Sequence, residues 1–470
     1  MLYAPGTVQR TTLAPYDAAV PWTPALAAFA RDAQVFLRHT TEEGQSGIAY
    51  AALLSGTHAM RHGVYRQPGR LSDAVQTIAE AFHDAGWETY FWAGHPMASP
   101  ELNYAQGVPP VNTFSRHRGP LDPPQDEGLR AEDPRFVGLL DGLRTDRGRR
   151  ALVITNFTVS HAPYPAEYAD AFCAKDPREC SGMDADERRR LTGLYRDHFL
   201  DWIFDFEGTA DRHGLRPDER ARLERTVTIL YRSSISQLDA LFGAVVAAID
   251  GRGLRDESVV AFTADHGEIL GRDVAGRRWT HGFVLSPEDI MVPLLVRAPG
   301  VPAGRWGGVS RSIDVFPTLA GLAGVPVGDA VMGADLSAAL RGAEDHAAIV
   351  AFNHTALQPD SWQEPPFASI ARGPSRRDPE GMWIAAHDGD LVMKLTGAAG
   401  TPLRLHAYDW AADPGEKKDL YDEKDAHYAA LAKRIDDYRA ALLAGVGEAA
   451  RSDMPTRRQQ ELLRSLGYIQ

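Results

Sequence analysis

Residues 258–282 read SVVAFTADHGEILGRDVAGRRWTHG and combine an apolar run with two His-Gly pairs. SVVAF is apolar without alternation, the pattern of a strand covered on both faces, as in a parallel sheet. Asp265 and His266 follow at its carboxyl end, where open α/β sheets bind their ligands. Either residue alone fits an ordinary turn or a satisfied polar group. Together with His281, they favour a binding or catalytic site.

Further apolar runs are expected to be strands: ETYFW (88–92), ALVITNF (151–157), PLLV (293–296) and AAIVAF (347–352). Helical patterns lie between them in TPALAAFARDA (23–33), SDAVQTIAEAFHDAG (72–86) and residues 217–250. The spacing in 217–250 predicts one buried stripe, formed by Leu223, Val227, Leu230, Leu238, Leu241, Val245 and Ile249. This order of elements predicts an α/β fold with a central, mostly parallel sheet flanked by helices.

The sequence pattern changes after residue 344. WIAAHDGDLVMKLT and LRLHAYDW predict antiparallel strands joined by Gly-rich turns, and residues 425–445 predict an amphipathic helix. We therefore expect an α/β domain over 1–344 and a smaller α+β subdomain over 345–470. Charged residues 166–220 are expected to be a surface insertion, in which a disulfide between Cys173 and Cys180 and two free thiols both fit.

Composition excludes some classes of function. The chain has 470 residues and a formal net charge of −13, which disfavours nucleic acid or acidic membrane as partner. An anionic substrate would need a locally positive site. No apolar run approaches the roughly 18–20 residues of a membrane span, and MLYAPGTVQRTT is not expected to be a signal peptide.

Several segments resemble the sulfatases of the alkaline phosphatase superfamily, in the order in which that family has them. These segments are TPALAAFARDAQVF, AALLSGTHAMRHGVY, SHAPYP, SVVAFTADHGEILG, PLLVRAPG, RSIDVFPTLAGLAGVP, YDWAADPGEKKDLYD and LRSLGYI. The resemblance covers almost the whole chain. It implies an alkaline-phosphatase-like fold and a hydrolase of sulfuric or phosphoric esters.

The resemblance also implies roles for single residues. Asp265 and His266 would be ligands of one divalent cation, for which Mn, Mg, Ca and Zn are all candidates. His161 and His281 would contact substrate oxygens or the leaving group. Ser46 falls at the position of the nucleophile and would also contact the metal. An N-cap serine is the structural alternative, because a helical run follows it.

Two departures concern the nucleophile. Family members oxidise this residue to formylglycine when Pro and Arg follow at two and four positions; here Ile48 and Tyr50 stand there. We therefore expect no formylglycine and an unmodified Ser46, suited to a phosphoryl intermediate. The family's active-site Lys falls at His95.

The N-terminal metal ligands also differ. Aligned with the family, Gly6 replaces a metal-binding Asp and Thr11 a second acidic residue. A shifted register, a missing first strand and an incomplete metal site would each explain this.

The sequence thus predicts a metal-dependent ester hydrolase acting on an anionic small-molecule, glycan or lipid-type substrate. A catalytically degenerate homologue that serves as a binding module and a phosphoryl-group transferase are the alternatives. The resemblance suggests a periplasmic or extracytoplasmic location, although no signal peptide is expected. The sequence predicts neither the substrate nor the oligomeric state.

Overall fold

The computed structural model describes residues 1–115, 128–272, 276–342, 348–357, 379–397 and 401–449. An eight-stranded sheet forms its centre, in the order β10-β2-β9-β6-β1-β5-β3-β4. The strands are β1 (Leu2–Pro5), β2 (Gln34–Thr40), β3 (Glu88–Ala93), β4 (Thr113–Ser115), β5 (Ala151–Phe157), β6 (Val260–Thr263), β9 (Leu294–Arg297) and β10 (Gly304–Arg311). All neighbouring pairs are parallel except those of β9, which runs antiparallel to β2 and β6.

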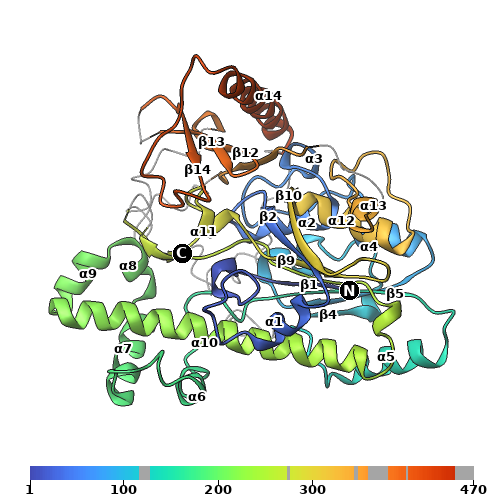
Figure 1. The fold of residues 1–470 in the computed structure, drawn as a ribbon, viewed down its shortest axis with the longest axis horizontal. Helices are drawn as coiled ribbons and strands as arrows, with labels where there is room; N and C mark the ends of the chain where they lie inside the picture. Colours follow the sequence, from blue (N-terminus) through green and yellow to red (C-terminus); the bar gives the residue numbers. More distant parts are fainter. Residues whose placement is uncertain (116–127, 273–275, 343–347, 358–378, 398–400, 450–470) are drawn as a thin grey trace.

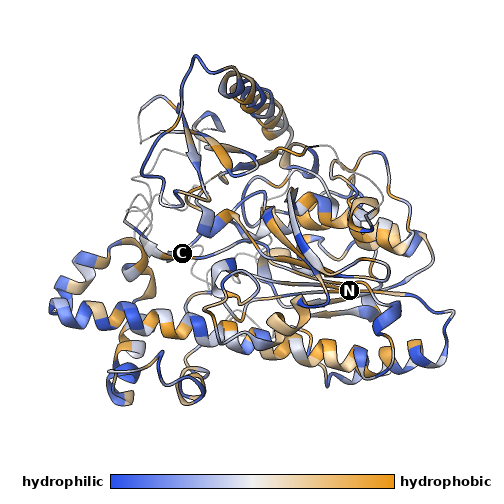
Figure 2. Cartoon of the chain, in the orientation of Figure 1, coloured by the Kyte–Doolittle hydropathy of each residue, from blue (hydrophilic) through white to orange (hydrophobic). Residues whose placement is uncertain are grey.

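Helices cover both faces of this sheet, as Figure 1 shows. α2 (Ser46–Ser55), α4 (Ile78–Asp84) and α12 (Ser312–Ala323) lie on one face, and α1 (Pro24–Ala30), α5 (Pro134–Thr145) and α10 (Pro217–Asp250) on the other. Alternate strand residues supply the two cores: Tyr3 packs towards α10, whereas Leu2 and Ala4 pack towards α2. In Figure 2 the central strands are mostly orange, and α10 alternates between orange and blue.

The predicted fold class is confirmed, with three differences in detail. PLLV forms β9, the antiparallel strand. AAIVAF contributes to β11 (Ala351–His354), which belongs to a second sheet rather than to the parallel one. The alternative of a missing first strand is wrong: β1 is present and pairs with β5 and β6 in the middle of the sheet.

α10 carries the predicted stripe with one correction. Leu241 is only partly buried and Phe242 takes its place in the core. Within the described part of the chain, α10 is the one helix whose length and composition would suit a membrane span. Its apolar stripe packs against the sheet and against α1, so the same properties are those of a core helix.

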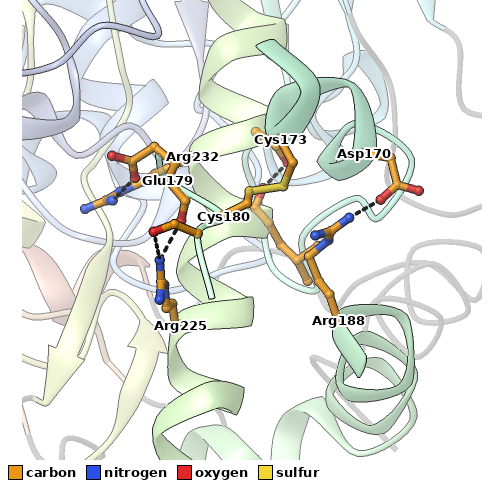
Figure 3. The surroundings of a disulfide bond; sticks show 10 residues. Asp170, Cys173, Glu179, Cys180, Arg188, Arg225 and Arg232 are labelled. Atoms are coloured by element: carbon orange, nitrogen blue, oxygen red, sulfur yellow. Dashed lines mark hydrogen bonds and ion pairs between the residues drawn. A yellow bond between two sulfur atoms is a disulfide. The ribbon is translucent and has the colours of Figure 1, made fainter. Parts of the chain in front are cut away.

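The helices α6 (Ala169–Lys175), α7 (Ala185–Asp197), α8 (Phe199–Phe204) and α9 (Phe206–Arg212) lie beside α10 (Figure 1). That residues 166–220 are an insertion stays a prediction. Cys173 and Cys180 are joined by a disulfide (Figure 3). The loop that they close is tied to α10, because Arg232 forms an ion pair with Glu179 and Arg225 donates to the Glu179 carbonyl.

A second sheet follows, in the order β11-β12-β13-β14, with β12 (Ile384–Asp388), β13 (Leu391–Thr396) and β14 (Arg404–Asp409). All its pairs are antiparallel, as predicted for this part. α14 (Ala426–Ala449) packs on it and contacts α3 (Ala59–His62) of the α/β part (Figure 1). The division at 344/345 stays a prediction, and LRSLGYI lies outside the described residues.

Candidate active site

The candidate site residues meet because parallel strands end at the same edge of the sheet. Ser46 follows β2, His95 follows β3, His161 follows β5, and Asp265 and His266 follow β6. His281 arrives differently, from a two-stranded ribbon of β7 (Ile269–Arg272) and β8 (Arg278–Thr280). The structure therefore brings together all five predicted site residues.

The turn after β6 fixes Asp265 and His266. Asp265 Oδ1 accepts hydrogen bonds from the amides of Thr7 (2.9 Å) and His266 (2.6 Å). The His266 carbonyl in turn accepts a hydrogen bond from the Val8 amide at 2.9 Å. Hydrogen bonds in both directions therefore connect the residues after β1 to this turn. Gly267 packs against the Glu288 carbonyl, where a Cβ would overlap the backbone, which explains the glycine in this turn.

Ser46 is the first residue of α2, and Gln45 is its N-cap, so the N-cap interpretation of Ser46 is wrong. The Ser46 hydroxyl is buried and lies 2.9 Å from His266 Nε2. His266 Nδ1 lies 2.8 Å from the Gly267 carbonyl, which can only accept, so Nδ1 carries the proton. In the neutral ring Nε2 then offers its lone pair to Ser46.

Three histidine rings lie in a row beside Ser46. The ring centroids of His266 and His281 are 4.2 Å apart, and those of His281 and His161 are 5.0 Å apart. Ser46 and His266 are buried, whereas His281 and His161 are partly exposed. Behind His281, the buried Glu268 places Oε1 3.5 Å from His281 Nδ1.

Burial dominates the electrostatics of this cluster. It lowers the pKa of His161, His266 and His281 to about 3 each, so the rings are neutral at neutral pH. Burial also raises the pKa of Asp265, despite the neighbouring His266 and the Thr7 amide. A site that is short of positive charge suits an anionic substrate poorly unless it also holds a cation.

His95 also lies at the site, although the sequence analysis assigned it no role. Its Nε2 lies 3.8 Å from Asp265 Oδ2, and its ring packs against Tyr50. Gly6 sits directly at the end of β1, where a Cβ would lie 3.2 Å from His95 Nε2. The register that aligns Gly6 with the family's Asp stays a prediction, and on that register His95 would lie beside the aligned position.

Asn156 also escaped the sequence reasoning. Its Oδ1 accepts from the amides of Gly94 (2.9 Å) and His95 (3.0 Å), and its Nδ2 donates to the Ala98 carbonyl. Asn156 thereby fixes the backbone that carries His95. The available signal was an amide side chain near the end of the mostly apolar run ALVITNF.

The residues fit a divalent cation only in part. Asp265 Oδ2 is buried and lies 3.5 Å from His266 Nε2, which brings a carboxylate oxygen and an imidazole nitrogen to one point. In the ranges that the structure describes, no group of three or more His, Cys, Asp or Glu residues is arranged to hold a metal ion. A cation here would depend on two side chains and the Ser46 hydroxyl.

Comparisons with known proteins agree with this architecture. The sulfatase family model matches residues 7–325. An endo-4-O-sulfatase of Bacteroides thetaiotaomicron is 25% identical over 356 residues, covering 66% of this chain and 63% of that protein. A sulfotransferase of low-salt glycan biosynthesis in Haloferax volcanii is 33% identical over 108 residues, covering 23% of this chain and 26% of that protein. The aligned parts thus span less than two thirds of either relative's own length.

The solved structures show the same fold. The phosphonate monoester hydrolase of Silicibacter pomeroyi has a TM-score of 0.64 at 19% identity, over 98% of this chain and 99% of that one. A structure determined with its substrate D-glucosamine-2-N,6-O-disulfate has a TM-score of 0.65 at 14% identity, with the same coverage of both chains. The prediction of the family is confirmed. The chain belongs to the sulfatase family.

Proposed function

We propose that this protein hydrolyses a sulfate or phosphate ester with the unmodified Ser46 as nucleophile. The observation that carries the proposal is the contact of the Ser46 hydroxyl with His266 Nε2 at 2.9 Å. The Gly267 carbonyl orients this imidazole, and the first turn of α2 carries the hydroxyl. A nucleophile within hydrogen-bond reach of a base that a third group orients is the arrangement of covalent catalysis.

In the proposed reaction the Ser46 oxygen bonds to sulfur or phosphorus while the bond to the ester's alcohol oxygen breaks. His266 Nε2 accepts the Ser46 proton and returns it to the departing alcohol. Water then attacks the seryl ester and gives a proton to His266, which passes it to the departing Ser46 oxygen as the acid is released. His161 and His281 flank this position and would contact substrate oxygens or the leaving group. Because His161 Nδ1 faces the Ala162 carbonyl and holds the proton of the neutral ring, His161 Nε2 would accept a proton or hydrogen bond, whereas His281 would donate to a non-bridging oxygen.

Asp265 and His266 remain the proposed ligands of one divalent cation, with the Ser46 hydroxyl as a third contact. A bound cation would polarise the ester and lower the pKa of a coordinated hydroxyl. The His266 Nε2 lone pair serves either the cation or the Ser46 proton, but not both at once. Metal titration of activity therefore separates the two ways of activating Ser46.

The substrate is proposed to be an anionic ester on a glycan or lipid-type molecule. The relatives support this class, since they include an enzyme named for a sulfate ester and a structure holding a disulfated glucosamine. We also propose an extracytoplasmic location, for which the disulfide between Cys173 and Cys180 is the structural support.

Group transfer to an alcohol acceptor is a second candidate. The match to a sulfotransferase favours it. Product analysis with an added alcohol would detect the transferred group.

The test of the proposal is Ser46→Ala, assayed with aryl sulfates and with phosphate mono- and diesters. Loss of turnover with retained folding supports the assignment. Ser55→Ala is the matched control: Ser55 is also buried in α2, but its hydroxyl bonds to Ala51 and Thr57, away from the site. Turnover that survives in Ser46→Ala would refute the nucleophile.

A further inference from the structure

A second buried cluster of titratable side chains lies outside the candidate site, in the loop that leads from β2 to Ser46. Glu42 is at its centre. Glu42 Oε1 accepts from the Ala59 amide at 2.8 Å and lies 3.0 Å from His58 Nδ1, and Oε2 lies 3.1 Å from His62 Nε2. All three donors come from α3 and the residue before it. This carboxylate therefore connects the Ser46 loop to α3.

The C-terminal sheet and α14 complete the cluster. The Tyr438 hydroxyl of α14 donates towards Glu42 Oε1 at 3.3 Å and lies 3.2 Å from His354 Nδ1 of β11. The His354 amide also donates to the Glu42 carbonyl at 3.1 Å. Glu42, His354 and Tyr438 are all buried. Two elements from far along the chain thus hold one loop residue.

The residues on either side of Glu42 are held from the same direction. Glu43 Oε1 accepts from the Ala356 amide at 3.0 Å, and Glu43 also accepts from the Gln45 amide. The Asn353 side chain donates to the Thr41 carbonyl. From Thr41 to Glu43, every residue of the loop contacts β11 or the residues next to it.

The cluster favours a single arrangement because it contains a buried charge. Burial alone would raise the pKa of Glu42, but the hydrogen bonds from His58 and His62 hold it well below its usual range. A buried carboxylate that loses a donor is strongly destabilised, so the loop has little freedom to move away from Tyr438. Ser46 begins α2 only three residues after Glu43.

We propose that the C-terminal sheet and α14 position the nucleophile through this cluster, which makes Glu42 and Tyr438 positioning residues for the reaction. The inference rests on the proposed function in taking Ser46 as the nucleophile. Displacement of a reacting group by about 1 Å can lower the rate on the order of 100-fold. Loss of the contacts that fix this loop should therefore lower kcat.

Tyr438→Phe is the test, since it removes the hydroxyl and keeps the ring. Glu42→Gln tests the other end of the same hydrogen bond. Tyr65→Phe is the matched control, because the Tyr65 hydroxyl also bonds to α14, at the Leu442 carbonyl (3.2 Å). Two measurements are made on each full-length variant: steady-state kinetics and hydrogen–deuterium exchange of the peptide that spans residues 41–49.

We expect Tyr438→Phe and Glu42→Gln to lower kcat about tenfold at unchanged KM. We also expect roughly fivefold faster exchange in residues 41–49, with Tyr65→Phe like the wild type. Wild-type exchange in 41–49 in both variants would overturn the inference, as would an equal increase in Tyr65→Phe. The exchange readout does not depend on catalysis, so activity that survives in Ser46→Ala would refute the proposed function and leave the exchange data to decide the inference.

Discussion

Glu42→Gln should destabilise the protein strongly at neutral pH, because both carboxylate oxygens of Glu42 accept hydrogen bonds from buried donors. The Ala59 amide donates to Oε1. His62 Nδ1 accepts from the Val64 amide at 3.1 Å, so His62 Nε2 carries a proton and donates to Oε2. A glutamine has one oxygen, so either orientation of its amide leaves one of these donors facing an NH₂ group. Loss of a charged hydrogen bond and a buried unsatisfied donor together cost about 3–5 kcal/mol.

The loss of stability in Glu42→Gln should depend on pH. The folded-state pKa of Glu42 lies well below its unfolded value, so its ionisation stabilises the native state above the unfolded pKa of about 4.3. This contribution is lost as the pH falls through the folded pKa. The difference in the free energy of unfolding between wild type and Glu42→Gln should therefore be constant above about pH 5 and become smaller in more acidic solution. His58, His62, His354 and Tyr438 face the side chain at position 42 in both proteins.

Urea unfolding between about pH 7 and pH 3.5 measures this gap. Glu88→Gln serves as the control: Glu88 pairs with Arg149 through two hydrogen bonds, but the pair is partly exposed, so the loss should stay near or below about 1 kcal/mol. A gap for Glu42→Gln no larger than that of the control, or one that does not narrow in acid, would refute the reasoning.

Three further predictions concern the site and the insertion. Asp265→Ala should abolish stoichiometric binding of Mn or Mg and the thermal stabilisation by the metal, which elemental analysis and melting curves detect; equal metal content in mutant and wild type would reject the ligand assignment. Protein purified without reductant should show no reactive thiol, and removal of the Cys173–Cys180 bridge should cost about 2–3 kcal/mol in unfolding experiments; two titratable thiols would contradict this. Mass spectrometry should find unmodified serine at position 46, with turnover of phosphate esters exceeding that of aryl sulfates; formylglycine at this position would contradict the mechanism.

Sequence patterns revealed the sheet best where strands are buried on both faces. ALVITNF matches β5 residue for residue, because continuous apolarity leaves few alternatives. β10 was not predicted: GRWGGVSR is an edge strand with partly exposed residues, so burial does not shape its composition. The direction of β9 was also beyond prediction from its own residues, since PLLV would suit either direction of a doubly covered strand.

For the site, residue types and the strand end singled out Asp265, His266 and His281, whereas Ser46 and His161 were chosen through the resemblance to the sulfatases. The sequence did not show which side chains from different strands come into contact. His95 lies beside Asp265 only because β3 and β6 are brought to one edge through β5 and β1. The Glu42 cluster was invisible for the same reason, as His354 and Tyr438 are more than 300 residues from Glu42 in the chain.

The central place of β1 has a consequence for how the protein is made. Leu2 pairs with Ile154 on one side and with Ala261 on the other, so β1 can be paired on both edges only after β5 and β6, which lie far later in the chain, have been synthesised. Until β5 and β6 have left the ribosome, the apolar β1 segment has no hydrogen-bonding partner on either edge. This slows folding and allows incorrect strand pairing. A nascent chain halted before β6 would already contain Ser46, His95 and His161, yet it would have neither the catalytic edge nor a finished core. We therefore expect this protein to depend on chaperones during synthesis more than a sheet of the same size built from consecutive strands.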